Sequence, residues 1–299
     1  MGDIYHIDKA RVRSSFSRAA SSYDAAAIVQ KLVREEMLSR LDLVKIKPQT
    51  ILDSGCGTGL ASHALKKRFK HARVLSLDFA YEMLQKTRKT GLVQSFKNAF
   101  SNTRHDVLCA DMECLPLANK SVDFLWSNLA IQWCNDLDQT FQEFHRVLRP
   151  ESLLMFSTFG PDTLRELRVA TQSAYQGSGT SVNRFIDMHD IGDALVRAGF
   201  SAPVLDVERF TLTYDDVKSV MRDLKSIGAH NATDGRARGL LGRGFLQKLE
   251  IAYEQFRTDG KLPATFEVVY GHAWRTEDKS LNADLNDGYS PVTFRPRNK

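Results

Sequence analysis

The sequence predicts an α/β protein built on one doubly wound, mostly parallel β-sheet, with an antiparallel edge strand and a helical excursion. Short β-rich runs alternate with helical patterns from residue 49 to residue 157, and such alternation builds a parallel sheet with helices on both faces. A glycine-rich turn joins the first strand pattern to the first helix pattern, as in nucleotide-binding sheets. Near the end of the chain, two strand patterns enclose a helical stretch, which indicates an excursion from the sheet edge.

The alternating region accounts for five strands and three helices. Runs of β-rich residues predict strands at Thr50–Asp53, Arg73–Asp78, Arg104–Cys109, Val122–Ser127 and Leu153–Thr158. Apolar residues at helical spacing predict helices at Leu60–Phe69, Tyr81–Lys89 and Asp138–Leu148. Pro150 ends the last of these helices, because proline removes a backbone donor.

The flanking segments give the domain boundaries. Residues 1–48 are expected to form a helical segment that covers the ligand site, with an amphipathic helix at Asp24–Leu43. The inner face of this helix is predicted to carry Ile28, Leu32, Val33 and Leu41. Residues 49–275 are expected to form the main domain, and residues 276–299, which are polar and lack periodicity, a mobile tail.

The second half of the main domain follows a different pattern. Its expected elements are helices at Thr163–Tyr175 and His189–Ala198, a strand at Val204–Tyr214, helices at Asp215–Ile227 and Leu240–Arg257, and a strand at Ala264–Trp274. Because the two helices lie between two strands, residues 215–260 are expected to leave the sheet edge and return to it. Such an excursion is placed to cap a ligand site.

Composition excludes several classes of protein. The chain has 299 residues, 42% hydrophobic and 26% charged, which is typical of a globular protein. Its net charge of +5 is far from the composition of nucleic-acid-binding proteins. No apolar run approaches the roughly 20 residues that span a bilayer, and no signal-peptide stretch opens the chain. We therefore expect a cytoplasmic protein with neither a nucleic-acid nor a membrane partner; the oligomeric state is left open.

The four cysteines have no pattern that indicates a disulfide or a metal site. They form no CxxC pair and no Cys/His spacing typical of metal ligands: Cys56, Cys109, Cys114 and Cys134. We expect reduced thiols and no bound metal.

The most informative motif is Ile-Leu-Asp-Ser-Gly-Cys-Gly-Thr-Gly at residues 51–59. A buried strand runs into a glycine-rich turn, and a helix follows directly. Glycine allows a positive φ and a close approach of the backbone to a ligand, while the helix N-terminus offers free N–H groups. Dinucleotide-binding folds use a similar turn, so an NAD site is the alternative. The GCGTG spacing, with Asp53 two residues earlier, instead resembles the first motif of class I S-adenosylmethionine-dependent methyltransferases, which have a Rossmann-like fold.

That resemblance assigns cofactor contacts at four strand ends. Asp53 would lie near the methionine end of S-adenosyl-L-methionine, and the turn residues Gly55, Cys56, Gly57 and Gly59 would contact the cofactor. Further candidates are Asp78 for the ribose hydroxyls, Asp111 and Met112 for adenine, Asn128 and Leu129 where substrate and cofactor meet, and Met83. Each has a plainer interpretation: Asp78 and Asp53 as caps, Asp111 as a loop carboxylate, and Met83 as packing.

Longer stretches resemble the malonyl-[acyl-carrier protein] O-methyltransferase family of biotin synthesis over about residues 9–275. The stretches that carry this resemblance are residues 12–20 with Tyr23-Asp24, Leu115–Leu117, Asn128–Cys134, Ser157–Gly160, Leu224–Asn231 and Leu262–Gly271. Asn-Leu-Ala-x-Gln-Trp and Leu-Lys-x-Ile-Gly-Ala-x-Asn are the most selective of these. Ser54, Pro150-Glu151-Ser152 and the tail after Arg275 depart from the family pattern.

The resemblance implies methylation of the free carboxylate of a malonyl thioester carried on acyl carrier protein, or on coenzyme A. Such a carboxylate is already ionised at neutral pH, so the reaction needs alignment rather than a general base. A bidentate arginine is the natural carboxylate ligand, and Arg184 is the candidate, with Arg13 and Arg18 as rivals. Tyr23 is expected to close over the cofactor, and Gln132 and Trp133 to line the acyl channel. In the plainer interpretation, these aromatic residues only pack.

The acidic carrier protein calls for a cationic docking face. We expect it in residues 218–248, which contain Lys218, Arg222, Lys225, Arg236, Arg238, Arg243 and Lys248. Two alternatives stay open: a methyltransferase of another small carboxylic acid or metabolite, and an assembly-factor relative that binds S-adenosylmethionine without methylating.

Overall fold

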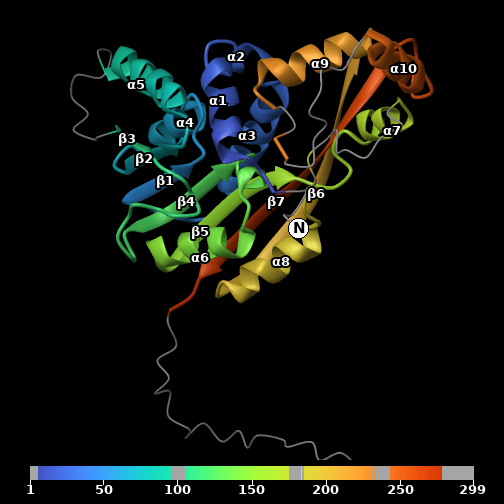
Figure 1. The fold of residues 1–299 in the computed structure, drawn as a ribbon. Helices are drawn as coiled ribbons and strands as arrows, with labels where there is room; N and C mark the ends of the chain where they lie inside the picture. Colours follow the sequence, from blue (N-terminus) through green and yellow to red (C-terminus); the bar gives the residue numbers. More distant parts are fainter. Residues whose placement is uncertain are drawn as a thin grey trace, which may run out of the picture.

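The computed structural model describes residues 6–95, 105–174, 183, 185–229, 232–233 and 243–277. Within them, one seven-stranded sheet has the order β3–β2–β1–β4–β5–β7–β6 (Figure 1). Its strands are β1 (Thr50–Ser54), β2 (Arg73–Asp78), β3 (His105–Cys109), β4 (Val122–Asn128), β5 (Leu148–Phe159), β6 (Phe200–Tyr214) and β7 (Leu262–Arg275). Strands β1 to β5 pair in parallel, whereas β7 runs antiparallel to β5 and β6. The predicted fold class is confirmed.

From α4 onward the described helices follow the predicted order with several changes of boundary, whereas α1 was expected only as part of a helical N-terminal segment. They are α1 (Lys9–Ala19), α2 (Tyr23–Ala26), α3 (Ile28–Arg40), α4 (Leu60–Arg68), α5 (Tyr81–Ser95), α6 (Leu137–Val147), α7 (Arg165–Ala174), α8 (Met188–Arg197), α9 (Val217–Ser226) and α10 (Arg243–Glu254), with 3-10 turns η1 (Leu41–Leu43) and η2 (Ile131–Trp133). The predicted sequence of strand, two helices and returning strand is present as β6, α9, α10 and β7.

The predicted helix at Asp24–Leu43 is wrong as a single element. It is divided into α2, α3 and η1, because Ala27 takes a non-helical ψ of 53°. The predicted inner face is also partly wrong. Ile28 and Leu32 are 47% and 38% exposed, whereas Val29, Val33, Met37 and Leu41 are buried. The division at Ala27 starts a new helix whose buried stripe begins one residue later.

Helices cover both faces of the sheet, and alternate residues of each central strand enter two different cores. On β5, Leu153 and Met155 join the core beneath α3, α4, α7 and α10, whereas Leu154 and Phe156 join the core beneath α6 and α8. Figure 1 shows α6 and α8 on the side of the sheet opposite α1 to α4. This alternation follows from the two-residue period of a strand, and it buries the parallel sheet on both faces.

The segment Pro150-Glu151-Ser152, which departs from the family sequence pattern, lies inside β5 and has a turn-like backbone. Glu151 has a φ of 59°, in the left-handed region that favours glycine. The chain therefore forms the local turn without the glycine that is common in the family, and the strand resumes at once.

The order of the strands places a ligand crevice at one edge of the sheet. The chain runs from β1 outward to β2 and β3 and then crosses to β4 on the other side of β1, so the strand order reverses between β1 and β4. Open α/β sheets bind ligands at the carboxyl ends of strands at this point. None of the described helices is both long enough and apolar enough to cross a membrane.

Candidate active site

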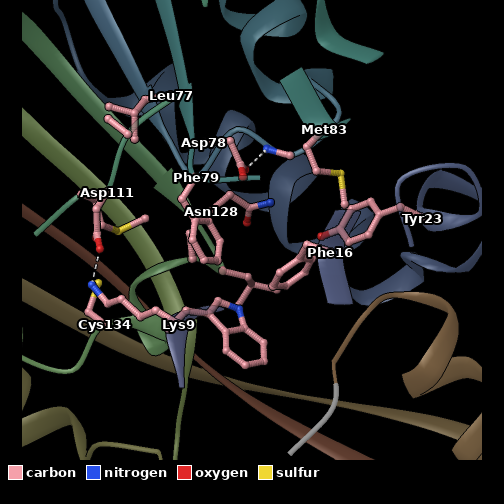
Figure 2. A pocket seen from close by; sticks show the side chains of 17 residues that line it. Lys9, Phe16, Tyr23, Leu77, Asp78, Phe79, Met83, Asp111, Asn128 and Cys134 are labelled. Carbon is pink, nitrogen blue, oxygen red and sulfur yellow. Dashed lines mark hydrogen bonds and ion pairs between the residues drawn. The ribbon is translucent and has the colours of Figure 1, made fainter. Parts of the chain in front are cut away.

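A cavity opens at the carboxyl ends of β1 to β4, and the N-terminal helices close one side of it (Figure 2). The empty space within it, counting its open mouth, is about 620 Å³. Its strand-end wall consists of residues at or just after the strands: Gly55, Gly57, Leu77, Asp78, Phe79, Ala110, Asp111, Met112, Asn128, Leu129 and Ala130. Its helical wall consists of Lys9, Phe16 and Tyr23; Met83, Trp133 and Cys134 complete the lining.

The glycine-rich turn forms the floor of the cavity. Gly55 has a φ of 77°, and a Cβ atom added there would lie 2.2 Å from the Cβ atom of Ala130. Only glycine fits this combination of backbone and space. The N–H groups of Gly55 and Cys56 both donate to the carbonyl oxygen of Leu77, which fixes the turn against β2.

Two predicted contacts of the turn lie outside the cavity lining. Gly59 also has a positive φ, and an added Cβ there would meet Thr87, so packing against α5 explains this glycine. The thiol of Cys56 is buried; burial, with the neighbouring Asp78 and Asp53, raises its pKa well above the ordinary value. The cysteine therefore stays a neutral thiol beneath the turn.

Asp78 at the end of β2 presents a carboxylate to the cavity. Its Oδ2 accepts a hydrogen bond from the Gly57 N–H at 2.9 Å, and its Oδ1 accepts one from the Ala80 N–H at 2.8 Å. Burial raises the pKa of Asp78 to about 6, although these backbone donors oppose the shift. Its oxygens remain acceptors for two adjacent hydroxyl groups, as a ribose presents them.

Asp53 lies behind the turn rather than among the lining residues. Its carboxylate accepts a hydrogen bond from the Ser62 hydroxyl at 2.5 Å, near the start of α4. Burial raises the pKa of Asp53 to about 7, and the hydrogen bond from Ser62 opposes this shift. The contacts match the capping interpretation, so a role of Asp53 at the methionine end stays a prediction.

Asp111 and Met112 follow β3 and lie at the other end of the cavity. The Nζ atom of Lys9 lies 2.5 Å from Asp111 Oδ2 and also donates to Glu113. Burial disfavours the Lys9 ammonium, but these two carboxylates outweigh burial and raise its pKa above the ordinary value. An acceptor and an apolar side chain therefore stand side by side at the predicted adenine position.

The end of β4 is held by a small polar network. The Ser157 hydroxyl donates to Asn128 Oδ1 at 2.9 Å and accepts from the Leu129 N–H at 3.0 Å. Leu129 has a φ of 48°, a strained value for a non-glycine residue that this network helps to hold. Gln132 lies outside the lining, because its amide donates to the Leu129 carbonyl at 2.6 Å and its oxygen accepts from Thr158 at 3.3 Å. Gln132 thus stabilises the loop after β4 without facing the cavity.

Aromatic side chains form the apolar part of the cavity. The Phe16 ring contacts Tyr23, Phe79 and Trp133 in edge-on geometry, with centroids 5.3 to 6.3 Å apart. Met83 is buried beside Tyr23 and also lines the cavity, so packing and ligand contact are compatible. Burial raises the pKa of the Tyr23 hydroxyl, and nearby Asp78 and Asp24 raise it further, so Tyr23 acts as a donor and not as a base.

Several residues that line the cavity were not predicted, and one predicted residue cannot be placed. Lys9, Phe16, Phe79 and Cys134 line the cavity without having been predicted to do so. Phe79 follows Asp78 directly, and Phe16 lies in a stretch that carries the family resemblance, so weak signals existed for both; Lys9 had none. Arg184 lies outside the described residues.

The two rival arginines can be placed. Arg13 and Arg18 are exposed on α1, and neither is among the residues that line the cavity. Among the described residues, no group of three or more His, Cys, Asp or Glu side chains is arranged to hold a metal ion.

Comparisons with known proteins agree with this geometry. A family model described as a methyltransferase domain matches residues 52–156. The malonyl-[acyl-carrier protein] O-methyltransferase of Methylovorus is 64% identical over 99% of this chain and 97% of its own length. The enzyme of the same name from Laribacter hongkongensis is 52% identical over 99% of each chain. A solved SAM-dependent methyltransferase of Thermotoga maritima, 16% identical, superposes with a TM-score of 0.51 over 89% of this chain and all of its own, which shows the fold alone.

Proposed function

We infer the function from one premise: the chain belongs to the malonyl-[acyl-carrier protein] O-methyltransferase family. The protein transfers a methyl group from S-adenosyl-L-methionine to the free carboxylate of malonyl-acyl carrier protein, and the resulting methyl ester primes pimeloyl synthesis for biotin. The observation that carries this conclusion is 64% identity over 296 residues, which includes every described element of the site.

The cavity fits the adenosyl cofactor. Acceptor carboxylates lie at two strand ends, Asp78 in position for ribose hydroxyls and Asp111 for an amine, and Met112 adds an apolar surface. The Gly55 position has no room for a side chain, as expected where backbone approaches a ligand closely. When bound, S-adenosyl-L-methionine supplies an electrophilic methyl group.

The residues of the chain have to position the acceptor and exclude water. A malonyl carboxylate, with a pKa near 4 in water, is ionised at neutral pH and needs no base. The Asn128 amide nitrogen donates one N–H to the Gln30 carbonyl, so its second N–H and the protonated Tyr23 hydroxyl can donate to a ligand between the two walls. Phe16 and Trp133 keep this part of the lining apolar. Arg184 remains our candidate for one carboxylate oxygen, since a bidentate arginine would fix its orientation.

We assign coverage of the cofactor site to residues 1–48 and capping to residues 215–260. Lys9, Phe16 and Tyr23 of the first segment line the cavity, which supports the first assignment. The Ser22 hydroxyl donates to the Ser226 carbonyl at 3.2 Å, so the end of α9 packs against this segment and supports the second. The exposed thiols among the four free cysteines persist in a reducing compartment, which favours the cytoplasm.

Intact-mass measurement of malonyl-acyl carrier protein tests the reaction. Incubation with enzyme and S-adenosyl-L-methionine should add the mass of one CH2 to the carrier-bound acyl group. Methylation of free malonate, but of neither malonyl-carrier protein nor malonyl-coenzyme A, would indicate an enzyme for small acids. Cofactor binding without methyl transfer to any of these would indicate the assembly-factor alternative.

We propose the helical excursion as the docking face for carrier protein. Arg222, Lys225 and Lys248 are exposed, and Lys218 is paired with Glu250. Arg236 and Arg238 lie outside the described residues, as does the side chain of Arg243. An acidic partner would be attracted to the remaining cations.

Reversing the charge of Arg222 and Lys225 to glutamate should raise KM for malonyl-carrier protein about three- to tenfold, because the docking attraction is lost. KM for malonyl-coenzyme A should stay unchanged, since that substrate has no protein surface to dock. Equal effects on both substrates, or no effect on the carrier-bound one, would contradict docking at α9. The measurement is initial rate against substrate concentration at low ionic strength.

A further inference from the structure

Lys9 reaches the cavity from the helical wall and meets the strand-end wall at Asp111. It is the first residue of α1, and Figure 2 shows its side chain extending to Asp111. Its Nζ atom donates to Asp111 and to Glu113. A lysine ammonium carries three protons, so one donor has no partner among the described residues while the group lines the cavity.

The Asp111 carboxylate is oriented on both of its oxygens. Oδ2 accepts from Lys9 at 2.5 Å, and Oδ1 accepts from the Glu113 N–H at 3.1 Å. Because an ionised carboxylate only accepts, Asp111 and Lys9 together present an acceptor beside a donor. The edge of adenine presents the complement, an amine donor next to a ring nitrogen that accepts.

The backbone just before Lys9 is anchored to the main domain, which fixes the position from which the Lys9 side chain extends. The Asn135 side chain accepts from the Ile7 N–H at 2.7 Å and donates to the Ile7 carbonyl at 3.0 Å. The Asp8 N–H donates to the Ala232 carbonyl at 2.9 Å. The Asp8 carboxylate in turn caps α1 through the Arg11 N–H. These contacts hold the start of α1 against two loops of the main domain.

A purely structural role of the Lys9 ion pairs explains the position of the ammonium less well than a contact with the ligand does. The Lys9 side chain is 26% exposed, and those of its partners Asp111 and Glu113 are 39% and 16% exposed; ion pairs that water still reaches add little to stability. The anchors at Ile7 and Asp8 already hold the segment without Lys9. The position of the ammonium inside the lining therefore points to a contact with the ligand.

We infer that Lys9 is a specificity-determining residue that reads the purine of the cofactor, donating to a ring nitrogen while Asp111 accepts from the amine. This inference rests on the proposed function, because it requires an adenosyl ligand in the cavity. Asn135 acts through Lys9 as a positioning residue. The purine site then combines two segments about a hundred positions apart in the chain.

Calorimetric titration with S-adenosyl-L-homocysteine and its 1-deaza and 7-deaza counterparts tests the inference. The wild-type protein should bind one deaza compound at least about tenfold more weakly than the parent, because one charge-assisted hydrogen bond is lost. Lys9→Met should bind the parent about ten- to a hundredfold more weakly and should no longer distinguish it from that deaza compound. Lys9→Arg, which keeps the charge and the donors, should restore much of the discrimination.

Three further variants separate ligand contact from structural support. Lys31→Met, at an exposed lysine of α3, should leave all three dissociation constants unchanged. Asn135→Ala should weaken binding of the parent but add little to Lys9→Met, because both remove one contact. The inference is overturned if Lys9→Met weakens all three compounds equally, or weakens none. Failure of the wild-type protein to bind S-adenosyl-L-homocysteine would contradict the proposed function instead.

Discussion

The two walls of the cavity are built in different ways. The strand-end wall consists of short loops that follow consecutive parallel strands, so the topology of the sheet alone brings Gly55, Asp78 and Asn128 together. The helical wall comes from α1 and α2, which precede the sheet in the chain and reach the cavity only through tertiary packing. The strand-end wall is therefore part of the sheet itself, whereas the helical wall packs against the sheet from an N-terminal segment.

This difference predicts different responses to mutation. The strand-end wall is fixed by backbone hydrogen bonds to β2 and by buried neighbours, so changes there should alter the shape or charge of the site itself. The helical wall meets the cavity through side chains such as Phe16, so changes to these side chains should alter the dissociation rate of a ligand. Affinity and dissociation rate separate the two cases.

Gly55→Ala should have the largest effect. The new Cβ would lie 2.2 Å from Ala130 Cβ, and the φ of 77° strains any residue with a side chain. Displacement of the turn by even about 1 Å should lower the affinity for S-adenosyl-L-homocysteine by about a hundredfold, as measured by calorimetry. Gly244→Ala is the matched control, because an added Cβ there meets nothing within 4 Å; it should leave the affinity unchanged. Near-normal binding by Gly55→Ala would show that the strand-end wall is more adaptable than its packing indicates.

The sequence predicts the strand-end wall because its signals are local. The carboxyl ends of parallel strands all meet at one edge of the sheet. A strand pattern followed by Asp78, or by Asn128, is therefore sufficient to place that side chain at the ligand-binding edge. The glycines at 55 and 57 are explained by the same argument. Local sequence does not distinguish a cavity residue from one just behind it, which is why Asp53 and Gln132 were grouped with the lining.

The helical wall and the inner face of α3 depend on packing that no local pattern records. The α1 sequence is rich in serine and arginine, so it has no clear helical pattern of apolar residues. The helix is stabilised by the Asp8 cap and by burial of Val12, Ser15 and Ala19. The break at Ala27 shifts the buried stripe of α3 by one residue, away from the periodicity of a continuous helix. Contacts such as Lys9 with Asp111 join positions about a hundred residues apart, which a single sequence does not reveal.

Asp78→Asn should have the next largest effect and should also change the pH dependence. With a pKa of about 6, Asp78 is ionised at neutral pH and protonated below that value. Ribose hydroxyls donate to the ionised form, so affinity for S-adenosyl-L-homocysteine should be full above about pH 7 and should fall about tenfold per unit below pH 6. Asp78→Asn should bind about ten- to a hundredfold more weakly at pH 8.

The shape of the pH profile distinguishes Asp78 from other titrating groups. The inflection near pH 6 should be absent from Asp78→Asn but present in the control Asp106→Asn, whose carboxylate pairs with Arg73 on β2. An inflection that persists in Asp78→Asn would assign the titration to another group. Asp53, whose pKa is about 7 and which lies outside the lining, would then be the candidate for the group whose protonation lowers the affinity.

Substitution of Phe16 should have the smallest effect and a different kinetic signature. Phe16→Leu keeps an apolar side chain but loses the edge-on contacts with Tyr23, Phe79 and Trp133, and should weaken S-adenosyl-L-homocysteine binding about threefold. Phe16→Ala should weaken it about tenfold. Because α1 lies over a preformed strand-end wall, the loss should appear in the dissociation rate, measured by stopped-flow displacement, with the association rate unchanged. Phe210→Ala, at a half-buried ring on β6 outside the lining, should leave both rates unchanged. A slower association rate with unchanged dissociation would mean that Phe16 preorganises the open site, and the two walls would then form a single unit.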